Sequence, residues 1–492
     1  MIYYITIYML VSQALFARTF GGTNEDEALS IIQTSDGGYA VAGYTSSFGA
    51  GLSDFLVLKL ASDGSIQWAR TFGGTTNDSA WSIIQTTDGG YALAGWTASF
   101  GAGEHDFLIV KIDGSGLLQW AKTFGGANRD EAYSIIQTSD GGYAVAGYTA
   151  SFGSVGDFLI LKLNASGDLE WARTFGGNSI DLAWSIIQTT DGGYAVAGHT
   201  TSFGAGNYDF LIVKIDGSGL LQWAKTFGGL DVEWVSSIIQ TSDGGYAVAG
   251  HTTSFGAGGF DILILKLNSV GDIIWVRVLG GPGGNPAYSI VQTTDGGYAI
   301  GGMPSIIKVS ASGDLEWSRQ LYSTHGVSSA VQTTDGGYAM TGYLMVSFPP
   351  PDYDFFILKL GPDGNYTGCV FVPSLSVFTP VPSTSLPSLN TLSPTLGMDC
   401  SPVLTTPNIR VNDVCTPIAI EDDMVDYPGI TCSPFSGGIL FNSPADLGIN
   451  IYSVDGRVAY SGQLRQGENR ISLGRGVYLW RAGTYRGKAA VR

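Results

Sequence analysis

The stretch QTSDGGYAVAG at residues 33–43 decides the fold, because the chain repeats it seven times. The aspartate of its Asp-Gly-Gly core recurs in steps of 52, 52, 51, 52, 52 and 40 residues, at Asp36, Asp88, Asp140, Asp191, Asp243, Asp295 and Asp335. A repeat of this length indicates a solenoid, a propeller or an array of small units. The glycines after each aspartate accept the positive φ of a tight turn, so each copy is predicted to be a turn.

One repeat is predicted to contain four short strands. Within residues 28–74, the apolar runs SIIQT, YAVAGYT, FLVLKL and SIQWARTF are separated by the turn SDGG, the long loop SSFGAGLSD and the turn SDG. Nearly continuous apolar runs are typical of strands that are covered on both faces. Such a small sheet must stack on copies of itself. We therefore expect an all-β fold, a seven-bladed propeller of four-stranded antiparallel blades over residues 15–370.

The two ends of the repeat region are predicted to share one blade. LFARTFGG at 15–22 matches the fourth run of the repeat, as in QWARTFGG at 67–74, yet it precedes any first run. At the other end, FFILKL at 355–360 is a third run with no good fourth run after it. The N-terminal piece is expected to supply the outer strand of the last blade and so close the ring.

Tryptophan recurs once in each repeat, within patterns such as LNASGDLEWARTFGG at 163–177. The set comprises Trp68, Trp120, Trp171, Trp223, Trp275 and Trp317. The pattern resembles the tryptophan-docked blades of quinoprotein-type propellers. The resemblance implies that each indole packs between neighbouring blades. Only this packing role is inferred from the resemblance, and no quinone or other cofactor is expected.

A ring of aspartates is a weak candidate for Ca²⁺ binding. These residues precede the first strand of four repeats, at Asp26, Asp78, Asp130 and Asp181. Ca²⁺ takes roughly six to eight oxygen ligands, which carboxylates can supply. The alternative is that each carboxylate accepts backbone N–H groups and pins its own loop. This alternative is favoured, because no D-x-D-x-D-G pattern occurs and the aspartates are expected a blade-width apart.

No catalytic residue is assigned. His199 and His251 take the place of Tyr44 and Trp96 of other repeats, which favours packing of a planar ring. The sequence lacks a G-x-S-x-G elbow, an H-E-x-x-H pair and a P-loop. A glycosidase with two distant carboxylates stays open. The sixth repeat loses its SFGAG loop and the seventh replaces it with LMVSFPPPDYD, so residues 300–354 are the expected place for any binding site.

The N-terminal end and the cysteines indicate export. Residues 1–14 are apolar and end in small residues, as in a secretory signal peptide, although the basic n-region is missing and the true start is expected upstream. A membrane anchor or a first strand are the alternatives, but the stretch is short for a span of about 20 residues. All four cysteines, Cys369, Cys400, Cys415 and Cys432, follow the repeats and predict one or two disulfides of unassigned pairing.

The C-terminal part has a different composition. Residues 371–435 form a predicted linker that is rich in Pro, Ser and Thr, and residues 436–492 carry eight basic against three acidic side chains. The latter segment is similar to the C-terminal sorting domain of type IX secretion cargo. The matching residues are Asp455, Gly456 and Arg457 of IYSVDGR, then Gly476, Val477 and Tyr478, and Lys488 in the basic last strand. The resemblance implies a small β-sandwich, the type IX machinery as partner, and the outer surface of a Gram-negative bacterium.

The expected function is binding. The formal net charge of −18 argues against nucleic acid as a partner. No segment is expected to span a membrane in the mature protein. We expect an exported, non-enzymatic scaffold for a glycan, a protein or a surface polymer. A propeller-type polysaccharide hydrolase or lyase, and a purely structural surface-layer component, are the alternatives.

Overall fold

The computed structural model describes residues 15–364, except 23, 154, 257–258, 281–283, 304, 321–324 and 348–351. It also describes the backbone of 403–405, 410–413, 431–435, 438–443, 447–453, 458–465, 467–472, 476–482 and 485–491. The predicted signal peptide, most of the predicted linker, and Cys369, Cys400 and Cys415 lie outside the described residues. Among the described residues there is no helix that is long and apolar enough to cross a membrane.

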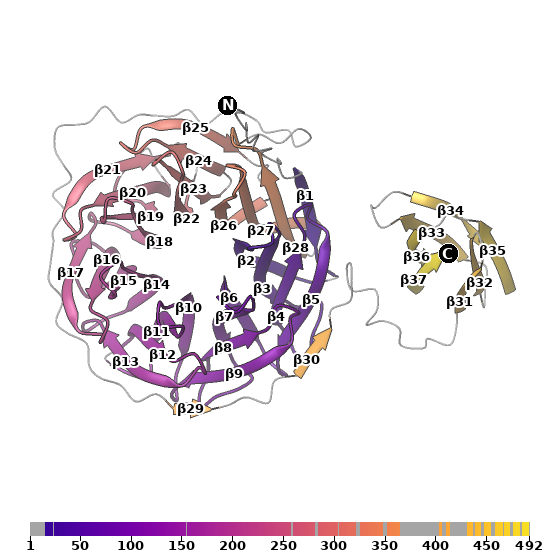
Figure 1. Ribbon diagram of the computed structural model, residues 1–492, viewed down its shortest axis with the longest axis horizontal. Helices are drawn as coiled ribbons and strands as arrows, with labels where there is room; N and C mark the ends of the chain where they lie inside the picture. Colours follow the sequence, from indigo (N-terminus) through magenta and orange to yellow (C-terminus); the bar gives the residue numbers. More distant parts are fainter. Residues whose placement is uncertain are drawn as a thin grey trace, which may run out of the picture. The chain divides into compact units, whose positions relative to one another are not determined.

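Seven four-stranded antiparallel blades stand around a ring, as the repeats predict (Figure 1). In chain order the first three are β2–β5 (Asp26–Gln33, Tyr39–Thr45, Asp54–Leu60, Ile66–Gly73), β6–β9 (Asp78–Gln85, Tyr91–Thr97, Asp106–Ile112, Leu118–Gly125) and β10–β13 (Asp130–Gln137, Tyr143–Thr149, Asp157–Leu163, Leu169–Phe175). The next two are β14–β17 (Asp181–Gln188, Tyr194–Thr200, Asp209–Ile215, Leu221–Phe227) and β18–β21 (Glu233–Gln240, Tyr246–Thr252, Asp261–Leu267, Ile273–Leu279). The last two are β22–β25 (Ala287–Gln292, Tyr298–Gly302, Ser305–Val309, Leu315–Gln320) and β26–β28 (His325–Gln332, Tyr338–Ser347, Asp352–Leu360), the latter completed by β1 (Phe16–Phe20).

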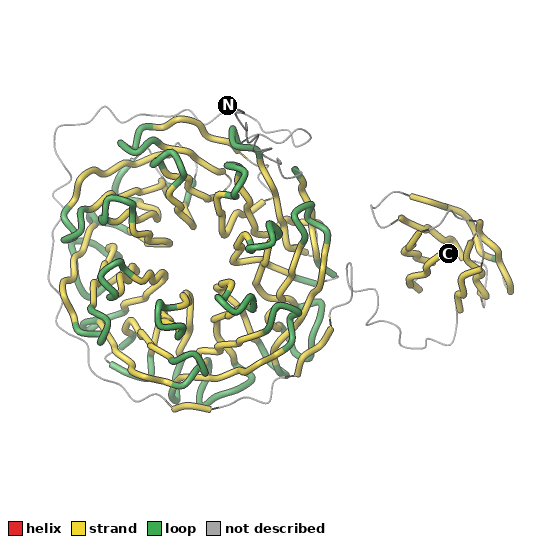
Figure 2. The backbone as a smooth tube through the Cα atoms, viewed as in Figure 1, coloured by secondary structure: helices red, strands yellow, loops and turns green. Residues whose placement is uncertain are grey.

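The first strand of each blade lines the centre of the ring and the fourth lies outside (Figure 1). Because the strands alternate in direction, the DGG turns and the turns between third and fourth strands share one end of the ring, which we call the turn face. The loops between second and third strands share the other end with the blade-to-blade connections, and we call it the loop face (Figure 2). Bridges such as Ser53 to Asn77 tie these two kinds of loop together.

The ring closes as predicted. Strand β1 pairs antiparallel with β28, with Phe16 opposite Lys359 and Phe20 opposite Phe355. Phe16 holds the position that tryptophan holds in the other blades. Its ring packs edge-on to Tyr39 of the first blade, with centroids 5.7 Å apart. Trp120 packs on Tyr143 in the same way, also at 5.7 Å. The blade-docking aromatics therefore run through the closure.

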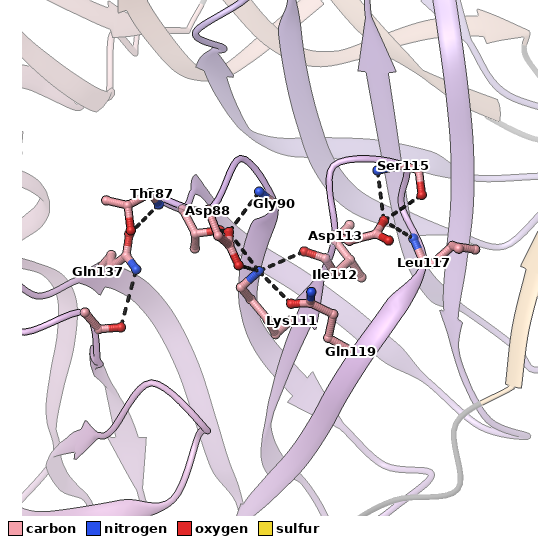
Figure 3. Close-up of polar contacts among 12 residues, drawn as sticks. Thr87, Asp88, Gly90, Lys111, Ile112, Asp113, Ser115, Leu117, Gln119 and Gln137 are labelled. Carbon is pink, nitrogen blue, oxygen red and sulfur yellow. Dashed lines mark hydrogen bonds and ion pairs between the residues drawn. The ribbon is translucent and has the colours of Figure 1, made fainter.

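Each DGG turn is built around a buried lysine, which the sequence analysis did not single out. In the second blade, Lys111 of β8 is 3 % exposed, and its Nζ lies 2.9 Å from Asp88 Oδ2 and 3.0 Å from the Ile112 carbonyl oxygen (Figure 3). Asp88 in turn accepts a hydrogen bond from the Gly90 amide. Burial opposes the charge of Asp88, but hydrogen bonds from Thr86 and Lys111 lower its pKa to about 2. The same pair recurs in all seven blades, as Lys59–Asp36, Lys111–Asp88, Lys162–Asp140, Lys214–Asp191, Lys266–Asp243, Lys308–Asp295 and Lys359–Asp335.

Glutamines connect these turns from blade to blade. The Thr87 amide donates to Gln137 Oε1 of the next blade at 2.8 Å (Figure 3). Equivalent bonds join Ser35 to Gln85, Ser139 to Gln188, Thr190 to Gln240, Ser242 to Gln292, Thr294 to Gln332 and Thr334 to Gln33. The last bond joins the seventh blade to the first. The turn face is thus held by a closed circle of hydrogen bonds.

The C-terminal unit contains two sheets. One has the order β31–β32–β35 (Thr431–Phe435, Gly438–Ser443, Gly467–Ser472) and the other β34–β33–β36–β37 (Val458–Leu464, Leu447–Ser453, Gly476–Ala482, Tyr485–Val491). Strands β33 and β34 pair antiparallel on either side of the expected hairpin turn, whose residues Asp455, Gly456 and Arg457 lie outside the described residues. The predicted linker contributes β29 (Val403–Thr405) and β30 (Arg410–Asp413), which extend the second and first blades at their outer edges. The packing of the two C-terminal sheets as a sandwich stays a prediction.

The closure predicts a large effect for one side chain of β1. Phe16 is 5 % exposed, so Phe16→Ala is expected to lower the free energy of unfolding by about 3 kcal/mol in urea denaturation. Arg18→Ala, at an exposed position of the same strand, should cost less than about 1 kcal/mol, because the contacts of Arg18 with the Phe16 ring and the Asp63 carbonyl lie at the surface. Deletion of 15–22 should be more damaging than either. Equal midpoints for the two single variants would contradict a closure that depends on packing.

Candidate functional site

A β-bulge interrupts the innermost strand of each blade. In β2 the pairing with β3 skips a residue between Ala28 and Ser30, and the same shift occurs in the innermost strand of every blade. The bulged residues are Leu29, Trp81, Tyr133, Trp184, Ser236, Tyr288 and Ser328. Bulges re-aim side chains and are frequent beside functional sites.

On one side of the axis the bulged residues are large and contact each other. Tyr133 stacks on Trp184 with ring centroids 4.3 Å apart, and Trp81 packs edge-on to Tyr133 at 5.2 Å. Trp81 also lies 5.6 Å from Trp184, although a whole blade separates their strands. Contact between non-neighbouring blades requires that these side chains converge on the axis. Among the described residues, no group hydrogen-bonds to the buried Nε1 of Trp81.

On the fifth and sixth blades the aromatic rings are open to solvent. Trp234, Phe260 and Tyr288 are 39 %, 38 % and 36 % exposed, which is unusual in a chain whose other blade aromatics are mostly covered. All three surround His251, with ring centroids 5.4, 4.9 and 6.5 Å from the imidazole. Trp234 and Phe260 are nearly parallel, with an interplanar angle of 17°. We call these four residues the aromatic platform.

His251 is buried, yet one of its ring nitrogens has no partner. The side chain is 5 % exposed, and among the described residues nothing hydrogen-bonds to its Nδ1. Burial lowers the pKa of His251 to about 4, against a hydrogen bond to the Ala287 backbone. The ring is therefore neutral at physiological pH. Its counterpart His199 differs, because its Nδ1 accepts a hydrogen bond from Trp184 Nε1 at 3.0 Å.

His199 is neutral as well. Burial and the neighbouring His251 lower the pKa of His199 to about 3. Its ring stacks on Trp234, with centroids 5.7 Å apart, and so links the platform to Trp184. The structure thus buries both histidines among aromatic rings, near the loop-face ends of second strands.

A polar cluster lies on the second and third blades. Glu131 is 1 % exposed and contacts His105 Nδ1 at 2.7 Å and Arg129 Nε at 2.6 Å. The Tyr133 hydroxyl donates to the same carboxylate. His105 stacks on Trp96 at 4.2 Å and keeps 27 % of its side chain exposed. His105, which is isolated in the sequence, is therefore part of a network.

The first blade carries a second glutamate, Glu27, which is partly buried. Tyr44 donates its hydroxyl hydrogen to Glu27 Oε2 at 2.9 Å. Burial raises the pKa of Glu27. Tyr288 and Tyr343 lie near enough to Glu27 that its charge raises their own pKa values, in addition to the effect of their burial.

The four candidate Ca²⁺ aspartates are buried in the loop face. Asp26 accepts hydrogen bonds from the Gly22 amide at 2.7 Å, from Ser47 Oγ at 2.8 Å and from Thr45 Oγ1. The same loop contacts surround Asp78, Asp130 and Asp181, and burial raises the pKa of all four. Among the described residues, no group of three or more histidine, cysteine or acidic side chains is placed to hold a metal ion.

Each of these aspartates lies close to a second carboxylate, which comes from the third strand of the preceding blade. A Cβ atom on Gly73 would lie 1.7 Å from Asp54 Oδ1 and 2.8 Å from Asp78 Oδ2, so the two acids meet over this glycine. Burial and the charge of Asp78 together raise the pKa of Asp54 to about 6, against hydrogen bonds from Gly51 and Ala50. The two acids meet because the third strand of one blade and the first strand of the next begin side by side.

The region expected to hold the site, residues 300–354, is described only in part. The turn between β23 and β24 is short, as the lost loop predicts. Residues 348–351 and the side chain of His325 lie outside the described residues. Tyr343 does lie near the axis, where its hydroxyl donates to Met303 Sδ at 3.5 Å.

Most of the axial residues were missed, although the repeats contain a signal for them. Structural positions hardly vary: the tyrosine after each DGG turn is constant at Tyr39, Tyr91, Tyr143, Tyr194, Tyr246, Tyr298 and Tyr338. The bulged position instead holds leucine, tryptophan, tyrosine and serine in different blades. The residue before the third strand varies as well, and includes Ser53, His105, Tyr208 and Phe260. The positions at which the near-identical repeats differ therefore indicate where a site lies, on the part of the loop face nearest the axis.

The chain was compared with known proteins. Residues 34–66 and 138–170 match the model of a family described as a domain of unknown function (DUF5122) beta-propeller. Regulatory protein FlaEY of Caulobacter vibrioides is 28 % identical over 189 residues, which are 35 % of this chain. The chain spans about a fifth of the length of that relative, since the match covers 20 % of it.

Solved structures show weaker likenesses. The extracellular domain of the putative hybrid two component system BT4673 from B. thetaiotaomicron is 10 % identical, with a TM-score of 0.41 over 98 % of this chain and 59 % of that one. PorZ of Porphyromonas gingivalis, a surface component of the type-IX secretion system, is 10 % identical, with a TM-score of 0.27 over 97 % and 100 % of the two chains. Likenesses at this level do not extend to function.

The buried carboxylates predict how stability depends on pH. The pKa of Asp54 is higher in the folded chain than its usual 3.8, so its neutral form is favoured by folding. Its contribution is complete below about pH 4 and is lost as the pH rises through 6. In urea denaturation, the free energy of unfolding that Asp54 contributes is lost between pH 4 and pH 7. Asp54→Asn should therefore lose less stability over this pH range than wild type, by about 1 kcal/mol or more.

Asp36→Asn is the control in the same blade. The pKa of Asp36 is about 2, so its contribution is complete above pH 4 and is lost only in stronger acid. This variant should lower stability by the same amount at pH 5 and at pH 7. Parallel pH profiles for wild type and Asp54→Asn would contradict a raised pKa at Asp54.

Proposed function

We propose that this protein is an exported, non-enzymatic binding scaffold whose ligand contacts the axial residues of the loop face. The observation that carries this proposal is the pattern of divergence between the blades. The framework positions repeat from blade to blade, whereas the bulged positions and the aromatic platform differ. A purely structural ring has no need for different side chains at its axis, but a binding surface for an asymmetric ligand does.

The exposed rings support the same proposal. Trp234, Phe260 and Tyr288 sit together on neighbouring blades, and aromatic side chains are enriched in the centres of binding sites. The β framework holds these side chains in place, so little side-chain entropy is lost when a ligand binds to them.

Export is the second part of the proposal. The apolar residues 1–14 and the sorting-domain motifs around Asp455, Gly476 and Lys488 support secretion through the type IX machinery to the outer surface of a Gram-negative bacterium. The paired strands β33 and β34, and β36 and β37, are compatible with the β-rich domain that the resemblance implies.

A hydrolase or lyase is the second candidate, and one observation favours it. His105 is partly exposed and Glu131 holds its Nδ1 at 2.7 Å, an arrangement that orients the other ring nitrogen as a base.

The purified chain should be applied to arrays of glycans and surface proteins, with and without Ca²⁺, and the bound material analysed for products. We expect binding without turnover. Loss of binding in Trp234→Ala would tie it to the axial residues, and turnover that disappears in His105→Ala would replace our proposal by the enzymatic one.

Sorting is tested in cells. A chain that lacks residues 436–492 should accumulate in the periplasm of a type IX-competent bacterium, while the full chain reaches the surface or the medium. Fractionation and immunoblotting measure this. Surface delivery of the truncated chain would remove the sorting domain from the proposal.

A further inference from the structure

We infer that the ligand of the aromatic platform is a neutral saccharide. This inference rests on the proposed binding function and names the ligand class of the same site. It depends on the rings of Trp234, Phe260 and Tyr288, on the unpaired nitrogen of His251, and on the charge around them.

The rings offer a surface for stacking. Each keeps more than a third of its area open, and Trp234 and Phe260 are nearly parallel, with centroids 6.3 Å apart. Trp234 belongs to β18 and Phe260 to the loop before β20 of the same blade. A pyranose ring presents apolar C–H groups on its faces, which cover aromatic rings of this kind, and the hydroxyls at its rim stay free for hydrogen bonds.

The polar groups of the site fit a hydroxyl. Among the described residues, His251 Nδ1 has no hydrogen-bond partner, although the side chain is 95 % buried in the middle of the three rings. The other ring nitrogen donates to the Ala287 backbone, so in the neutral ring Nδ1 is an acceptor. A sugar hydroxyl can donate to Nδ1 when the rings that cover this nitrogen turn aside. An unpaired buried nitrogen is costly and calls for a ligand or water.

Charge selects against anions. Arg129 belongs to the polar cluster, and Glu131 already pairs with it at 2.6 Å. Glu27 adds a second, partly buried carboxylate, and the net charge of the chain is −18. Among the described residues around the platform, a phosphate, a sulfate or a uronate would therefore meet no unpaired cation. The platform itself contributes no charged side chain, since His251 is neutral.

The test uses the full chain and neutral hexasaccharides of glucose, mannose, xylose and N-acetylglucosamine, with oligogalacturonate as the anionic comparison. Isothermal titration measures affinity. We expect one or more neutral probes to bind and oligogalacturonate not to bind. Trp234→Ala should weaken binding at least tenfold, as expected for a central aromatic contact. His251→Phe keeps a planar ring but removes Nδ1 together with the nitrogen that bonds to the Ala287 backbone, and should weaken binding about five- to tenfold.

Ile274→Ala is the matched control, because Ile274 is an exposed apolar residue of the outer strand β21. It should leave the affinity unchanged. Failure of every neutral probe to bind, or equal affinity in wild type and His251→Phe, overturns the saccharide inference. If a protein on the array binds and loses its affinity in Trp234→Ala while no sugar binds, the proposed function stands and only the ligand class is wrong. If nothing binds in a Trp234-dependent way, both fail.

Discussion

The fold depends on a lysine that is nearly inaccessible to solvent and is bound to the aspartate of the DGG turn. A buried ammonium group is unfavourable unless it is paired and hydrogen-bonded. Lys111 meets this requirement through Asp88, the Ile112 carbonyl and Gln119. The pair fixes the third strand against the turn between the first two, so that it sets the shape of the blade. Removing one partner would leave an unpaired charge buried in the sheet. The free energy lost in this way is larger than the net stabilisation that the pair provides.

This repeated turn leaves the opposite end of the ring free to vary. Lysine, aspartate and glutamine hold the blades on the turn face, while tryptophan and tyrosine hold them at the periphery. None of these residues reaches the bulged positions at the axis. Side chains there can differ in size and polarity between blades without disturbing the framework. The large cluster of Trp81, Tyr133 and Trp184 and the open rings of the platform are two results of this freedom.

The sequence was sufficient for the architecture but not for the axis. The fixed step between DGG turns predicts seven blades, and LFARTFGG in front of the first blade predicts the closure by β1. The lysine in FLVLKL was passed over, because one charge in an apolar run has no meaning until the turn that it binds is placed. The bulge caused the larger omission. It shifts the alternation of the innermost strand by one residue, so no reading of alternation alone assigns Leu29 or Trp81 to the axis. The carboxylate pair of Asp54 and Asp78 was hidden for a similar reason, since it joins residues of neighbouring blades.

The strand that closes the ring also gives the protein a way to exchange segments between copies. Without β1, the strand β28 is an open sheet edge, and its unpaired N–H and C=O groups can hydrogen-bond to any strand of matching sequence. The fourth runs of all other blades have nearly that sequence, as does β1 of a second molecule. At high concentration during refolding, two chains can therefore trade their N-terminal strands and form a domain-swapped dimer in which every blade is complete. The near-identity of the repeats makes the ring regular. For the same reason, the product of refolding depends on which strand pairs with β28 first.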